Sequence, residues 1–203
     1  VLLEPYGGEI LGLSVSATTI LTALWSVGAL VGFALAARWL KDGFSPYRMC
    51  VRGLLTGIAA FSAVIFADPM NSPALFYLGA TLIGLGGGLF AVATLTAAMT
   101  LPMGAKAGQG LALGAWGAAQ ATAAGLAIAI GGTIRDTVQA IVSSGALGET
   151  LNTPGTAYSV VYHLEIALLF GTLIVLGPLV RLAFTNPQRP TGTSGIGLAD
   201  FPT

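Results

Sequence analysis

The stretch at 74–99, ALFYLGATLIGLGGGLFAVATLTAAM, decides the class of fold that this chain adopts. It holds no charged side chain and is longer than the roughly 20 apolar residues that a helix needs to cross a bilayer core. Four further runs have comparable length and hydropathy, at 16–40, 49–67, 111–133 and 159–182. The sequence therefore predicts an all-α, polytopic membrane helix bundle with five complete transmembrane helices.

The composition of the whole chain also indicates a membrane protein. Hydrophobic residues make up 55% of the 203 positions and charged residues 8%, whereas soluble domains carry about 25% charged residues. The mean hydropathy is +0.85. Because eight Lys and Arg balance eight Asp and Glu, no basic footprint is available for a nucleic acid. We expect membrane lipid, and no nucleic acid, as a partner.

The segments between the runs carry residues that stop helices. KDGFSPYR at 41–48, DPMNSP at 68–73 and TLPMGAKAGQG at 100–110 each supply proline, glycine or charge. The connection at 134–158 is longer, and its IRDTVQAIV part keeps apolar residues at helical spacing. This part is expected to form a short interfacial helix or, as the commoner explanation, to extend the fourth run. Residues 183–203 are expected to trail as a poorly ordered tail.

The basic residues predict which side of the membrane each connection occupies, because Lys and Arg are retained on the cytoplasmic side of short loops. Under strict alternation of five crossings, Arg135 alone falls on one side. The other side holds Arg38, Lys41, Arg48, Arg52, Lys106, Arg181 and Arg189. We therefore expect the C-terminus in the cytoplasm and the 134–158 connection outside.

Aromatic residues near the run ends fit an interfacial belt. Trp39, Phe44 and Tyr47 are expected at the inner boundary, and Phe76, Tyr77, Tyr158 and Tyr162 at the outer boundary. Such positions report depth in the membrane rather than function.

Pairs of glycines four residues apart recur in four of the five runs. Both members of a pair lie on one helix face, where they let two backbones approach closely in lipid. The predicted helix-packing glycines are Gly28 and Gly32, Gly53 and Gly57, Gly84 and Gly88, and Gly110 and Gly114. The GLGGG run at 84–88 favours a crowded helix crossing over a bend or the close approach of a flat ligand.

Two ionisable residues inside the last run are candidates for function, because such groups cost about 3 kcal/mol in hydrocarbon. His163 and Glu165 are two residues apart, roughly 200° around a helix, so they face different neighbours. His163 is a candidate axial ligand for a bound metal macrocycle or a proton shuttle; the slightly favoured alternative is an interfacial histidine bonded to loop backbone. Glu165 is expected to face protein or a pocket, and the alternative is a buried hydrogen bond to a neighbouring helix.

Trp116 and Gln120 lie four residues apart in the fourth run and share a face. An amide beside an indole suits a flat aromatic ligand. It equally suits interhelical hydrogen bonding and packing.

The sequence does not assemble the groups that an enzyme needs. It has one His and one Cys, and it lacks HExxH, GxSxG and paired carboxylates within one run. We therefore expect no enzymatic activity, no catalytic residue and no metal-ion site.

Three stretches resemble a known family. They are VLLEPYGGEILGLSVSATTILTALW at 1–25, GALVGFALAARWL at 28–40 and LGATLIGLGGGLFAVATLTAAMTL at 78–101. Together they resemble the PucC/LhaA family, the bacteriochlorophyll-delivery branch of the major facilitator superfamily in phototrophic bacteria. The sharpest parts are LEPYGG at 3–8 and IGLGGGLFAV at 83–92, and the resemblance covers nearly all of 1–182. It implies the C-terminal half of a twelve-helix fold, in which 1–8 closes the seventh helix.

The resemblance implies a membrane assembly factor of the intracytoplasmic photosynthetic membrane of purple bacteria. Such a factor would bind bacteriochlorophyll or deliver it to light-harvesting antenna apoproteins, with the reaction centre as a further partner. The pigment anchors would be Glu4, His163, Glu165, Trp116 and Gln120. A structural subunit permanently bound to a reaction centre–antenna complex is one alternative. A small-solute secondary transporter is another, although it needs polar groups near the midplane, where only Gln120 lies.

Two departures from the superfamily weaken the transporter alternative. The chain lacks the first half of the twelve-helix fold, so we expect either a longer parent protein or a truncated relative. Half a bundle cannot carry out alternating access alone, because that mechanism needs two halves that move against each other. The acidic residue of the GxxxDR motif is also missing, because Gly32 is followed by Ala36 and Ala37.

Overall fold

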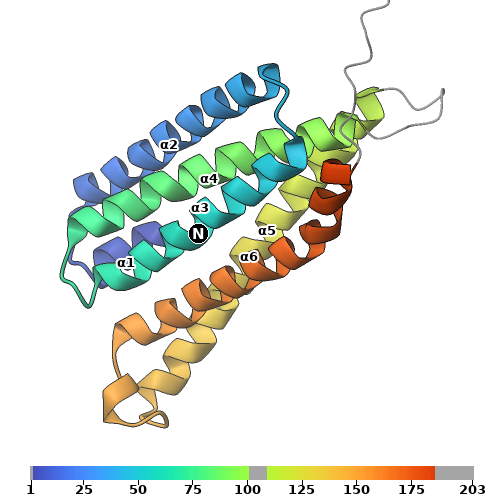
Figure 1. The fold of residues 1–203 in the computed structure, drawn as a ribbon. Coiled ribbons are helices and arrows are strands. Elements are labelled where there is room, and N and C mark those ends of the chain that lie inside the picture. The colour runs from blue at the N-terminus through green and yellow to red at the C-terminus, as the bar shows by residue number, and fades with distance from the viewer. Residues whose placement is uncertain (1, 101–108, 186–203) are drawn as a thin grey trace, which may run out of the picture.

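A computed structural model describes residues 2–100 and 109–185 as a bundle of helices (Figure 1). The helices are α1 (Leu3–Glu9), α2 (Val15–Lys41), α3 (Pro46–Ala67), α4 (Pro73–Met99), α5 (Gln109–Ser143) and α6 (Pro154–Thr185), with a 3₁₀ turn, η1 (Glu149–Leu151). The described residues form no strand. Helices α2 to α6 are long and apolar enough to cross a membrane, which confirms the predicted all-α bundle with five transmembrane helices.

Local sequence explains where several helices begin. Ser14 and Ser72 each accept a hydrogen bond of 3.3 Å from the backbone N–H three residues later, which caps α2 and α4. Pro46 and Pro73 occupy the start of α3 and α4, where a missing N–H leaves no helical bond unmade. For this reason α3 begins three residues before the apolar run at 49–67.

The helix containing the fourth run is longer than the run itself. Instead of ending at residue 133, α5 continues to Ser143, so in the structure the IRDTVQAIV part extends this helix and does not form a separate one. Similarly, α6 begins at Pro154 instead of residue 159. Of the expected tail, residues 183–185 belong to α6, and the remainder lies outside the described residues, as do Lys106 and Arg189.

Glycines set how closely α2 approaches α4. A Cβ on Gly28 would overlap the carbonyl oxygen of Thr81, and a Cβ on Gly84 would overlap that of Trp25. Gly32 and Gly88 lie along the same crossing, also against backbone of the opposite helix. The two backbones therefore touch directly, as close packing in lipid requires.

The opposite face of α4 packs on α3 in the same way (Figure 1). A Cβ on Gly53 or on Gly86 would come within 3 Å of the other residue's carbonyl oxygen. Gly57 lies against the side chain of Leu169 on α6, whereas no described atom lies within 4 Å of a Cβ on Gly87. Three glycines of the 84–88 run thus serve two helix crossings.

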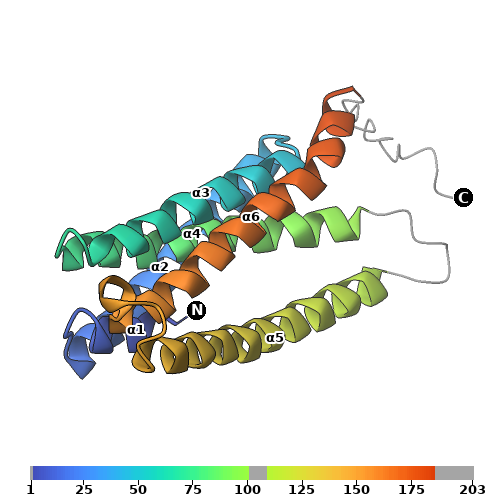
Figure 2. The ribbon, with the colours of Figure 1, turned by 90° about the horizontal axis from the view of Figure 1, so that it is seen from below.

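Helix α5 stands apart from this packed group, as Figure 2 shows. The most apolar 18 residues of α5 include no buried residue, whereas 44% of the corresponding residues of α3 and of α4 are buried. No described atom lies within 4 Å of a Cβ at Gly110 or Gly114. The expected packing of this glycine pair is therefore not formed among the described residues, because α5 diverges from α4 and α6.

The core at the α1 end of the bundle is built from aromatic rings. The ring of Tyr6 lies 5.4 Å, centroid to centroid, from those of Phe76, Tyr158 and Tyr162. All four side chains are buried, with at most 3% exposed. Phe76, Tyr158 and Tyr162 therefore face protein and not the lipid of an interfacial belt, because α1 inserts Tyr6 among them; their expected depth at the outer boundary stays a prediction.

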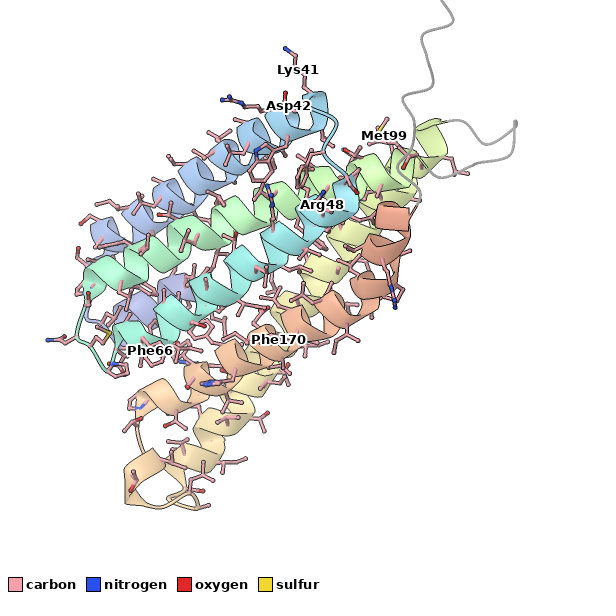
Figure 3. The ribbon with its side chains drawn as sticks, viewed as in Figure 1. Lys41, Asp42, Arg48, Phe66, Met99 and Phe170 are labelled. Atoms are coloured by element: carbon pink, nitrogen blue, oxygen red, sulfur yellow. The ribbon has the colours of Figure 1, made fainter. Side chains whose placement is uncertain are left out.

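The described basic residues separate by end of the bundle. Lys41 and Arg48 lie where α2 turns into α3, beside Asp42 (Figure 3). We call this the basic end; Arg38, Arg52 and Arg181 also lie near it, because the helices that carry them begin or end there. Arg135 lies near the other end, in the last part of α5, where α1 is also found.

Candidate functional site

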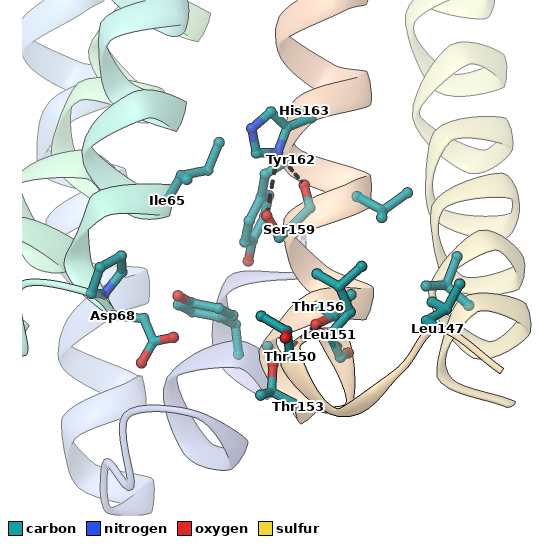
Figure 4. Close-up of a pocket in the computed structure, with 15 residues that line it drawn as sticks. Ile65, Asp68, Leu147, Thr150, Leu151, Thr153, Thr156, Ser159, Tyr162 and His163 are labelled. Carbon is teal, nitrogen blue, oxygen red and sulfur yellow. Dashed lines mark hydrogen bonds between the residues drawn. The ribbon is translucent and has the colours of Figure 1, made fainter. Parts of the chain in front are cut away.

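A cavity of about 600 Å³ lies at the end of the bundle opposite the basic end (Figure 4). Helix α1, the end of α3, the first turns of α6 and the segment between α5 and α6 form its walls. The polar residues that line it are Asp68, Thr150, Thr153, Thr156, Ser159 and His163, and the apolar lining includes Ile65, Leu147, Leu151 and Val160. Volumes of this size are typical of sites for small molecules and cofactors.

His163 is held on this wall by its own helix. Its Nδ1 lies 2.7 Å from the backbone oxygen of Ser159 and 3.3 Å from the hydroxyl of the same residue (Figure 4). A carbonyl oxygen only accepts hydrogen bonds, so Nδ1 carries a hydrogen. In the neutral ring Nε2 then carries a lone pair, and no described residue hydrogen-bonds to it. His163 is thus bonded to the backbone of its own helix and not to loop backbone, and this bond leaves Nε2 available as a ligand.

Tyr162 forms a fixed wall between two cavities. Its phenol donates a hydrogen bond of 3.1 Å to the backbone oxygen of Leu2, and its side chain is 1% exposed. His163 lines the large cavity, whereas Glu165 lines a cavity of about 40 Å³ between α5 and α6, beside Leu2 and Gly131. The two residues face different neighbours, as their spacing indicates. Glu165 makes no hydrogen bond to a described residue.

A polar network that the sequence did not reveal joins three helices at the same end. The guanidinium of Arg135 on α5 forms an ion pair with Glu9 of α1 and donates a hydrogen bond of 2.9 Å to the hydroxyl of Tyr158 on α6. Tyr158 in turn donates to Glu9, at 2.7 Å. The feature of the sequence that could have revealed this network is the isolated position of Arg135, because a cation at the end of an apolar run needs a counterion.

The other expected pigment anchors do not reach the large cavity. Glu4 accepts a hydrogen bond from the hydroxyl of Thr22, which links α1 to α2. The indole N–H of Trp116 donates to the hydroxyl of Thr94 at 3.1 Å and links α5 to α4. Gln120 is exposed on α5 and makes no hydrogen bond to a described residue. The five anchors therefore do not form one site.

The residues that line the large cavity could bind a metal only if most of its ligands came from another molecule. In the described part of the chain, no group of three or more His, Cys, Asp and Glu could hold a bare metal ion. A metal in a macrocycle needs only an axial ligand, and neutral imidazole is a common one. The Nε2 atom of His163, beside a cavity lined partly by apolar residues, meets that requirement.

Comparison with known proteins gives consistent matches in phototrophic bacteria. The family model described as PUCC protein matches residues 1–184. An uncharacterized protein of the puhA-bchM intergenic region of Rhodobacter capsulatus is 55% identical over 100% of this chain and 42% of its own length. Protein PucC of Cereibacter sphaeroides is 49% identical over 90% of this chain and 38% of its own.

A more distant relative carries a name that refers to the pigment. The bacteriochlorophyll synthase 44.5 kDa chain of Rhodobacter capsulatus is 31% identical over 96% of this chain and 43% of its own length. The chain thus spans about two-fifths of the length of these curated relatives. No solved structure matches the chain.

Proposed function

Since the chain belongs to the PucC family, we propose that it serves the assembly of photosynthetic light-harvesting complexes by binding bacteriochlorophyll at the His163 cavity. The pigment would then pass to antenna apoproteins, with the reaction centre as a further partner. The observation that carries the proposal is the 2.7 Å contact between Nδ1 of His163 and the backbone oxygen of Ser159, which leaves Nε2 available beside a cavity of about 600 Å³. The names of the relatives support a role in photosynthesis.

Different residues of this chain would make different contacts with the pigment. His163 would supply the axial nitrogen, and the hydrogen bond from Nδ1 to Ser159 would fix the orientation of its ring, as a second-shell acceptor does for metal-bound histidines. The hydroxyls of Thr150, Thr153 and Thr156 would offer donors to carbonyl groups of a bound molecule. Bacteriochlorophyll would supply a magnesium ion that accepts a nitrogen ligand. Apart from this reversible coordination, no covalent bond is made or broken in this role, so we propose a binding protein and not an enzyme.

The membrane and its sidedness are part of the same proposal. We place the five long helices as helices eight to twelve of a major-facilitator-like fold in the photosynthetic inner membrane. The basic end and the C-terminus would lie in the cytoplasm, because Arg38, Lys41, Arg48 and Arg52 gather there. The His163 cavity would then open toward the outer side.

A structural subunit of a reaction centre–antenna complex is the second candidate. The observation in its favour is α5, whose most apolar 18 residues include no buried residue although the helix carries glycines suited to close packing. A partner helix from such a complex would cover it. The transporter alternative rests on Gln120 as the polar group near the midplane, and this residue is exposed on α5, so we do not propose transport.

Purification of the full-length protein from a bacteriochlorophyll-producing host separates the two candidates. An assembly factor should carry the pigment absorbance and should lose antenna polypeptides during washing in mild detergent. A structural subunit should keep a fixed ratio to those polypeptides throughout. Preparations that never contain bacteriochlorophyll would contradict pigment binding.

A further inference from the structure

We propose that the basic end of the bundle binds the phosphate of one anionic phospholipid, on a platform formed by Trp39, Phe44, Arg48 and Arg52. We call these four residues the arginine–aromatic platform. This site is independent of the His163 cavity, which lies at the opposite end of the bundle.

Stacking holds both guanidinium groups in place. Cζ of Arg52 lies 4.7 Å from the ring centroid of Trp39 and 4.3 Å from that of Phe44. Cζ of Arg48 lies 4.9 Å from the centroid of Phe44, and the two rings are 5.8 Å apart. A guanidinium that stacks on a ring by its face still presents its N–H donors at its edge, in the fork geometry that phosphate oxygens match.

The positive charge around the platform favours the binding of an anion. No carboxylate of the described residues forms an ion pair with the Arg52 guanidinium, whereas Arg135, near the other end, pairs with Glu9 and Asp136. Among the described residues beside the platform, Lys41 adds positive charge against one acidic residue, Asp42. A phosphate would supply the Arg52 guanidinium with a counterion that no described carboxylate supplies.

The start of α3 adds to this attraction. The side chain of Ser45 makes no capping bond at the start of the helix, where the first N–H groups have no partner within the helix. The N-terminal end of a helix carries a partial positive charge that favours anions. Arg48 and Arg52 lie in the first two turns of this helix, so both kinds of donor act in the same region.

The surroundings favour a lipid over a soluble anion. Arg52 is six residues after Pro46, about 9 Å along the helix, and this depth suits the boundary between headgroups and acyl chains. Leu55, three residues later on the same side of α3, is 52% exposed, and Phe66 is 57% exposed further along. A phospholipid can place its phosphate at Arg52 and its acyl chains along this exposed apolar side, which a free phosphate cannot do.

Native mass spectrometry of the purified full-length protein can test this site with phosphatidylglycerol and phosphatidylcholine at equal concentrations. We expect one phosphatidylglycerol to be retained in preference to phosphatidylcholine. Loss of one charge-assisted contact in Arg52→Gln should weaken its binding by about tenfold. Arg52→Lys keeps the charge without the planar fork, so it should retain part of the affinity. The matched control Arg38→Gln removes the same charge from the same end and should bind as the wild type does.

Folding and the source of the phosphate are checked in the same preparations. The melting temperature in lipid-free detergent should agree between Arg52→Lys and wild type, which shows that a loss of lipid is not a loss of fold. Equal retention of the two lipids, or equal losses in Arg52→Lys and Arg38→Gln, would overturn the proposal. It would also be overturned if inorganic phosphate raised the melting temperature as much as phosphatidylglycerol does.

Discussion

The phenol of Tyr158 donates a hydrogen bond of 2.7 Å to Oε2 of Glu9, a residue 149 positions earlier in the chain. Arg135 bonds to both residues, and its Cζ lies 4.9 Å from the centroid of the Tyr158 ring. One polar network therefore joins α1, α5 and α6 at the end of the bundle opposite the basic end. Because α5 has few other contacts, this network should matter most for the position of α5.

Tyr158→Phe tests the network with the least change in shape. The ring stays buried, but the hydroxyl that joins Glu9 and Arg135 is lost. We expect the free energy of unfolding, measured by denaturant titration in detergent micelles, to fall by about 1 kcal/mol. Asp136→Asn is the matched control, because the Asp136 side chain is 72% exposed and its ion pair with Arg135 should contribute little. A loss as large in the control as in Tyr158→Phe would show that the network is not the cause.

Gly84→Ala should disturb the crossing of α2 and α4. The new methyl group would overlap the carbonyl oxygen of Trp25, so the two backbones must move apart. We expect a loss of about 1–3 kcal/mol in the free energy of unfolding, as overpacking usually costs. Gly87→Ala makes the same chemical change on the same helix with no described atom within 4 Å, and it should leave stability nearly unchanged. Similar losses in both variants would argue against backbone contact at this crossing.

The sidedness of the bundle can be read with a thiol reagent that does not cross membranes. Cys50 is the single cysteine and is 1% exposed, so the unmodified protein should react slowly. In oriented vesicles, Lys41→Cys should react from the cytoplasmic side and Ser144→Cys from the other, since both positions are exposed at opposite ends of the bundle. Reaction of Lys41→Cys from the outer side, or of Ser144→Cys from the cytoplasmic side, would contradict the positive-inside assignment.

Hydropathy was sufficient to predict the five long helices, because each needs a long apolar run and a stop. The run at 74–99 agrees with α4 to within one residue at each end, because Pro73 begins the helix and charged residues or proline flank the segment. The end of α5 was harder to predict. Ile134, Val138 and Val142 keep the helical spacing beyond the charged Arg135, so the helix continues past the apolar run.

Packing partners could be predicted less well than helices. Gly84 and Gly110 belong to the same sequence pattern, yet a Cβ would meet backbone at Gly84 and no described atom at Gly110. The difference depends on where α5 runs relative to its neighbours, which one helix's sequence does not encode. The burial of Tyr158 and its bond to Glu9 depend likewise on α1, a helix too short to be recognised from hydropathy.

Pigment content per polypeptide in His163→Ala and Glu165→Gln is the most direct test of the proposed function. The two residues lie two positions apart on α6 but line different cavities, so the second variant controls for disturbance of the helix. With full-length protein purified from a bacteriochlorophyll-producing host, loss of the axial nitrogen should lower the bound pigment by about tenfold or more. Glu165→Gln should keep the wild-type ratio. Wild-type pigment content in His163→Ala would contradict the assignment of His163 as the ligand.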